Sequence, residues 1–166
     1  MSQKFDNAWD LLMELEGGIV DNPDDPGGLT KWGISQRSHP DVDIVNLTED
    51  EAKAIYKRDY WPPYMEHISD WGVAAELFEQ LVNMRPKTAV KIWQKALNYL
   101  GAGLTVDGEF GPITLRNLNG YSRRMRIPLL KALNGVQFMH FLKLVEGTDW
   151  ADTFARGWLR RIEFPS

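Results

Sequence analysis

The sequence contains no cysteine, which excludes disulfides, thiol nucleophiles and metal sites built on thiolates. It also lacks a long apolar run: its longest stretches without a polar residue, such as residues 71–75, have about five residues, and a membrane span needs roughly 18–20. The N-terminus is followed by charged residues instead of an apolar segment, so we expect no standard secretory signal.

Several site types are missing as well. His39, His67 and His140 form no His-x-x-x-His pair, which argues against a zinc amidase. An EF-hand loop starting at Asp21 would place Pro23 at the third ligand position, so calcium is not indicated either. No phosphate-binding loop, nucleophile elbow or dinucleotide fingerprint occurs. We therefore expect an activity that needs no metal and no cofactor.

What is present is one domain's worth of an ordinary globular chain, with 166 residues, 43% of them hydrophobic and 25% charged. The net charge of -4 is a sum of opposites. Residues 1–84 hold 6 Lys and Arg against 17 Asp and Glu, whereas residues 85–166 hold 13 against 6. We expect two electrically distinct segments, 1–84 and 85–166, packed as one compact body.

Apolar spacing, caps and glycines predict about seven helices. The predicted helices cover residues 5–16, 48–60, 71–82, 88–100, 112–120, 128–145 and 148–161. Residues 17–33 hold five glycines and two prolines, which indicates a turn-rich loop with a short β-hairpin. The expected fold class is therefore mainly α, with a small glycine-rich β-hairpin and loop.

Glu16 ends the first predicted helix and is followed by two glycines. The negative end of the helix dipole and the neighbouring apolar residues would raise the pKa of its carboxyl toward the value of a general acid. Asp25 lies in the following loop, where it can fold back opposite Glu16, with Thr30 behind it. Two carboxyls in different surroundings are what glycoside hydrolysis requires, although turn chemistry alone also explains aspartates in such a loop.

These residues also carry a resemblance. Glu16-Gly17-Gly18, followed by residues 21–35 (DNPDDPGGLTKWGIS), resembles the signature of glycoside hydrolase family 108, the lysozyme-like N-acetylmuramidases. Residues 107–114 (DGEFGPIT) resemble the peptidoglycan-binding motif of the second half of that family, and residues 154–161 extend the match. The resemblance implies a lysozyme-like helical fold, with the catalytic segment in residues 1–84 and a peptidoglycan-binding-like segment in residues 85–166.

By this resemblance Glu16 is the catalytic acid, Asp25 the second carboxylate and Thr30 a helper. The helical phage lysozymes space these three residues with eight and then five residues between them, whereas this chain has eight and four, so Asp21 and Asp24 stay open as second carboxylates. Family members usually carry Asp where this chain has Glu79.

Sugar rings stack on aromatic side chains. The residues expected to bind substrate are Gly28, Trp32, Tyr60, Trp61, Tyr64 and Asn83.

The implied function is cleavage of the β-1,4 bond between N-acetylmuramic acid and N-acetylglucosamine in bacterial peptidoglycan. We expect a phage endolysin that accumulates in the host bacterial cytoplasm and reaches the wall through a separate membrane pore. The expected state is a monomer that neither binds nucleic acid nor inserts stably into a membrane. A lytic transglycosylase and a non-catalytic peptidoglycan-binding protein are the alternatives. Arg123, Arg124 and Arg126 form a basic cluster that could attract an anionic cell-wall polymer, lipopolysaccharide or nucleic acid, although a solvated turn rich in arginine also explains it.

Overall fold

A computed structural model describes residues 2–16 and 30–146. Within these ranges the chain forms five α-helices, one short 3-10 helix and a two-stranded antiparallel sheet, which confirms the mainly α fold. The elements are α1 (Gln3–Glu16), β1 (Thr30–Lys31), β2 (Ile34–Ser35), α2 (Glu49–Tyr60), η1 (Pro63–His67), α3 (Trp71–Asn83), α4 (Pro86–Tyr99) and α5 (Pro112–Val145). The helix expected over residues 148–161 lies outside the described residues.

Local capping chemistry marks the starts of α2, α3 and α5. The Thr48 hydroxyl accepts a hydrogen bond from the Glu51 backbone N–H, and the Glu51 carboxylate accepts from the Thr48 N–H at 2.9 Å, which confirms the capping box of α2. Asp70 caps α3 by accepting from the Val73 N–H at 2.9 Å. Pro112 is the first residue of α5, as predicted, and α4 begins with Pro86, two residues earlier than predicted.

The prediction of two helices over 112–120 and 128–145 is confirmed in number, because α5 consists of two helical parts, but the break between them lies later than residue 120. α5 continues through Gly120 and is interrupted only at Met125, whose φ of -153° and ψ of 61° are not helical. The first part is held by tertiary contacts, because the Tyr121 hydroxyl donates to the Leu100 carbonyl at 2.9 Å. Pro128 lies in the first turn after the break, where its missing N–H costs no helical hydrogen bond.

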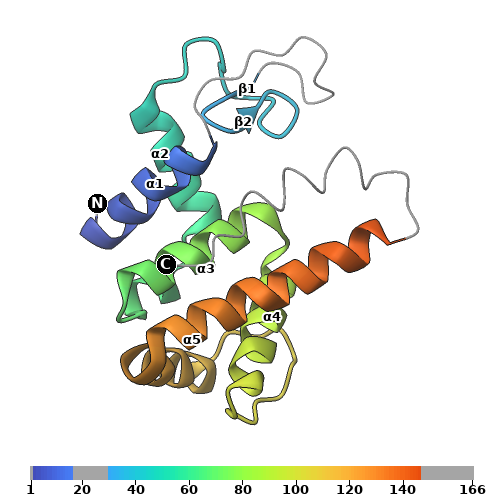
Figure 1. Cartoon of the computed structure of the whole chain (residues 1–166). Coiled ribbons are helices and arrows are strands. Elements are labelled where there is room, and N and C mark those ends of the chain that lie inside the picture. Colours follow the sequence, from blue (N-terminus) through green and yellow to red (C-terminus); the bar gives the residue numbers. More distant parts are fainter. Residues whose placement is uncertain (1, 17–29, 147–166) are drawn as a thin grey trace.

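α3 is the central helix. Figure 1 shows α1, α2 and the hairpin on one side of it and α4 and α5 on the other. The side chains of Leu77 and Phe78 on α3 are fully buried, as are Trp9 on α1 and Trp93 on α4. One hydrophobic core therefore runs through residues 5–136 and across the boundary expected between residues 84 and 85. In the described part of the chain, no helix is long and apolar enough to cross a membrane.

Candidate active site

Glu16 is the C-terminal residue of α1, where the predicted helix ends. The helix is fixed on the core by the buried Trp9 and Leu12 and to α2 by an ion pair of 2.7 Å between Asp6 Oδ1 and Lys53 Nζ. The position of the Glu16 backbone therefore follows from contacts within the described core. Among the expected site residues, the side chain of Glu16 and all of Asp25 and Gly28 lie outside the described residues.

Thr30 is half-buried in β1, where it pairs with Ser35 of β2. The two residues that join the strands, Trp32 and Gly33, have φ values of 55° and 72°. Positive φ at both central residues is the geometry of a type I′ turn, the turn that matches the twist of a tight hairpin. The Lys31 ammonium donates to the Val45 carbonyl at 3.2 Å and ties the hairpin to the segment before α2.

Trp32 combines two unusual features. A positive φ is unfavourable for a bulky residue and is common where function requires strain. Its indole N–H is buried and has no hydrogen-bond acceptor among the described residues, while the side chain packs partly against the core. A buried donor without an acceptor is costly, so Trp32 is the described residue of the hairpin best suited to receive an acceptor from a ligand.

One aromatic side chain, Tyr56 of α2, contacts both α1 and the hairpin. Its ring packs edge-to-face against Trp9 with centroids 5.1 Å apart, and its hydroxyl abuts Gly33. The ring of Tyr60 lies 5.4 Å from that of Tyr56. Tyr60 is half-buried, and this burial, together with the charge of Asp59, raises the pKa of its phenol. It stays neutral at physiological pH and can offer its hydroxyl or ring to a sugar.

Trp61 is placed differently. It is 5% exposed, and its ring packs edge-to-face against Phe5 and Phe78, with centroids 5.2 Å and 5.3 Å away. Its indole N–H donates to Glu66 Oε1 at 2.8 Å. A ring enclosed in this way has no free face for a sugar to stack on, so we assign Trp61 to packing.

Tyr64 joins the two halves of the chain. Its ring stacks on Phe110 at a centroid distance of 4.1 Å with an interplanar angle of 20°, and Trp93 meets it edge-on at 6.4 Å. Burial raises the pKa of Tyr64 to about 12. Phe110 belongs to the segment between α4 and α5, so one face of Tyr64 is already covered by protein.

Asn83, at the end of α3, belongs to a buried polar group that sequence reasoning did not anticipate. Its side-chain amide donates to Glu79 Oε1 at 2.5 Å, and Gln137 Nε2 of α5 donates to Glu79 Oε2 at 2.9 Å. Glu79 is 6% exposed and Gln137 is fully buried. The four-residue spacing of Glu79 and Asn83 on one helix could have predicted their hydrogen bond. The contact with Gln137 could not be predicted in this way, because it forms only when α5 packs against α3.

Among the described residues, no group of three or more His, Cys, Asp or Glu side chains could hold a metal ion. His39 instead contacts Asp59 at 3.3 Å, and a hydrogen bond from Arg58 lowers the pKa of that carboxyl. The described part of the site thus consists of the end of α1, a strained hairpin and the aromatic residues of α2.

Residues 9–84 match the family model described as Glycosyl hydrolase 108. The N-terminal segment is therefore a glycosyl hydrolase. Residues 88–163 match the model described as Predicted Peptidoglycan domain, so the glycosyl hydrolase 108 region and the peptidoglycan domain together account for most of the chain. A glycosyl hydrolase region followed by a peptidoglycan domain makes this chain a peptidoglycan hydrolase.

Among solved structures, the chain is similar to SagA of Brucella abortus. The TM-score is 0.68 at 27% sequence identity, over 95% of this chain and 88% of SagA. No curated protein matches the chain. Since the similarity to SagA spans both matched regions, the arrangement of the glycosyl hydrolase 108 region and the peptidoglycan domain is shared with a protein of known structure.

Proposed function

We propose that this peptidoglycan hydrolase is an N-acetylmuramidase that cleaves the β-1,4 bond between N-acetylmuramic acid and N-acetylglucosamine. The observation that carries the proposal is the position of Tyr56, which contacts Trp9 of α1 and Gly33 of the hairpin. The segment that holds Asp25 starts after Glu16 and ends at Thr30, and α1 and the hairpin that flank it are both anchored on this one side chain. This supports a site in which Glu16 and Asp25 act together.

In the proposed reaction Glu16 donates its proton to the glycosidic oxygen as the bond from that oxygen to the anomeric carbon breaks. A water molecule forms the new bond to the anomeric carbon and gives up a proton to the second carboxylate. Asp25 takes this role, with Asp21 and Asp24 as the alternatives. Thr30 orients the water, and Trp32 and Tyr60 contact the sugar. Residues 9–84 supply the chemistry and residues 88–163 hold the wall polymer.

The decisive experiment digests purified peptidoglycan with the parent and with Glu16→Gln and analyses the products by mass spectrometry. The parent should release muropeptides with free reducing ends, and Glu16→Gln should be slower by about 10²–10⁴-fold. Glu14→Gln, which removes an exposed carboxyl from the same helix, is the matched control and should keep full activity. Products ending in 1,6-anhydro rings would show a lytic transglycosylase, and full activity of Glu16→Gln would remove Glu16 from the mechanism.

We further propose that the enzyme serves as a phage endolysin, made in the host cytoplasm and released through a separate pore. The support is the combination of a glycosyl hydrolase 108 region with a peptidoglycan domain, in a chain whose described helices are all too short or too polar to span a membrane. Expression in a Gram-negative host should lyse the cells only when a pore-forming protein is produced with it. Lysis without that pore would contradict this role.

A further inference from the structure

The charged residues of α4 and α5, in the second half of the molecule, are all basic. α4 contains three Lys and Arg residues and α5 contains six, and neither helix contains Asp or Glu. Salt bridges on this face are correspondingly few: among the described residues, Arg126 pairs with Asp70 at 3.1 Å and Lys87 with Glu109 at 3.7 Å. The remaining cations of these two helices have no carboxylate partner in the described part of the chain.

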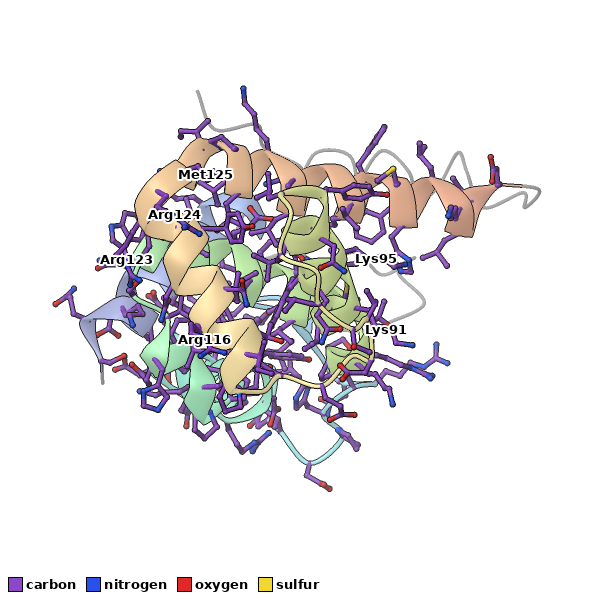
Figure 2. All side chains as sticks on the ribbon, turned by 90° about the horizontal axis from the view of Figure 1, so that it is seen from below. Lys91, Lys95, Arg116, Arg123, Arg124 and Met125 are labelled. Carbon is purple, nitrogen blue, oxygen red and sulfur yellow. The ribbon has the colours of Figure 1, made fainter. Side chains whose placement is uncertain are left out.

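Three of these cations surround a surface hollow of about 310 Å³ on the first part of α5. It is lined by Arg116, Asn117, Gly120, Arg123 and Arg124. Residues 116, 120, 123 and 124 follow one another at helical spacing, so they share one face of α5. Gly120 has no side chain to fill the space between the guanidinium groups. Figure 2 shows the three arginines along the first part of α5 and Lys91 and Lys95 separately on α4.

The arginines are exposed and available to a ligand. Arg116 and Arg123 have no ion-pair partner among the described residues, and the Arg124 guanidinium lies 5.2 Å from the centre of the Tyr121 ring. Guanidinium groups offer planar pairs of donors that match the oxygens of a phosphate group. A hollow with three such groups and no acid is therefore built for a phosphoryl ligand.

Exposed apolar side chains adjoin these arginines in the sequence of α5. Ile113 is 58% exposed and precedes Arg116 by three residues, and Met125 and Ile127 are 37% and 39% exposed at the helix break. Cations interspersed with apolar side chains are typical of surfaces that lie in the headgroup region of a bilayer. A surface for single-stranded nucleic acid would instead add exposed aromatic rings for stacking, and the ring on this part of α5, Tyr121, is buried.

We propose that the arginine face, defined as Ile113, Arg116, Gly120, Arg123, Arg124, Met125 and Ile127, binds the phosphate headgroups of an anionic phospholipid membrane. The arginines contact the phosphates while the apolar side chains enter the boundary of the acyl chains. Binding is peripheral, since no described helix could span the bilayer. This inference is independent of the proposed bond specificity, because the face is formed by α5 alone.

The test measures cosedimentation of the full chain with vesicles of phosphatidylglycerol and phosphatidylcholine in equal parts, and with phosphatidylcholine alone. The parent should bind only the anionic vesicles, and binding should weaken as salt is added. The triple variant Arg116→Gln, Arg123→Gln, Arg124→Gln should lose affinity by on the order of 100-fold, since each cation near the surface contributes about fivefold. The matched control, Lys91→Gln with Lys95→Gln and Lys131→Gln, removes the same charge outside the hollow and should lose far less.

A second variant, Gly120→Glu, keeps the arginines but places a carboxylate between them. It should abolish vesicle binding without lowering the melting temperature, because Glu is a better helix former than Gly and can pair with residues four positions away. Equal losses in the arginine and lysine triples would overturn the proposal, because a diffuse charge would then explain binding. The proposal would also be overturned if the arginine triple variant kept its binding to anionic vesicles and instead lost binding to purified peptidoglycan or to a short nucleic-acid duplex.

Discussion

Gly33 approaches Tyr56 so closely that a Cβ atom at position 33 would lie 2.4 Å from the Tyr56 hydroxyl oxygen. The turn of the hairpin thus packs directly against Tyr56 of α2. The ring of Tyr56 in turn packs against Trp9 of α1. The contact leaves room for no side chain at position 33. It also fixes the far end of the segment that carries Asp25 relative to the helix that ends at Glu16.

The first prediction follows from this contact. Gly33→Ala should lower the free energy of unfolding by more than about 2 kcal/mol, because the strain of a positive φ and the clash with Tyr56 add together. Gly103→Ala is the matched control: Gly103 has a φ of 68°, similar to the 72° of Gly33, but a Cβ atom at position 103 would have no other atom within 4 Å. Urea denaturation of both variants isolates the clash. Equal losses would show that Tyr56 does not restrain the hairpin.

The second prediction separates stability from activity at Trp32. Trp32→Phe keeps an aromatic ring and removes the buried N–H that lacks a described acceptor. It should raise the free energy of unfolding by about 1 kcal/mol, because a buried unpaired donor is lost. It should also lower kcat/KM on peptidoglycan by about tenfold, because the substrate loses a hydrogen bond. Full activity in Trp32→Phe would remove the indole N–H from substrate binding.

The third prediction concerns the contact between α5 and α3. Gln137→Met keeps the approximate volume of the side chain and removes the hydrogen bond to the buried Glu79 carboxyl. We expect a loss of about 2 kcal/mol in the free energy of unfolding, which is typical when a buried acidic group loses a donor. Gln137→Met in a Glu79→Gln background should cost less, since the remaining group is neutral. Equal costs in the two backgrounds, measured by thermal unfolding, would contradict the pairing.

The fourth prediction is a pH dependence. The pKa of Tyr64 is raised from 10.0 to about 12 by burial, so the folded state holds this proton where the unfolded state releases it. The resulting stability is fully present below pH 10 and is lost as pH rises toward 12. Tyr64→Phe should therefore flatten the fall of the melting temperature over this alkaline range. Tyr99→Phe, which changes a tyrosine that is 72% exposed, should leave the fall as in the parent.

Local structure was largely predictable. The end of α1 and the start of α2 follow from the glycines after Glu16 and from the Thr48 capping box, because capping and turn chemistry act over a few neighbouring residues, and α3 extends one residue beyond the predicted range of 71–82. The tight hairpin was expected within residues 17–33, and the two described strands lie slightly later, at Thr30–Ser35. The break in α5 was misplaced because Gly120 was taken as a helix end, whereas burial of Leu118 and Tyr121 on either side holds the helix through it.

The functional assignments divide in the same way. The sequence by itself determined the helical class and the motifs around Glu16 and residues 107–114, since these are patterns of adjacent residues. Only the tertiary structure decided which aromatic side chains are buried: Trp61 packs in the core, Tyr64 is covered by Phe110, and Trp32 keeps an unpaired N–H. It also joined Glu79 to Gln137 across 58 residues. Burial and pairing depend on which helix faces meet, and no local pattern specifies that.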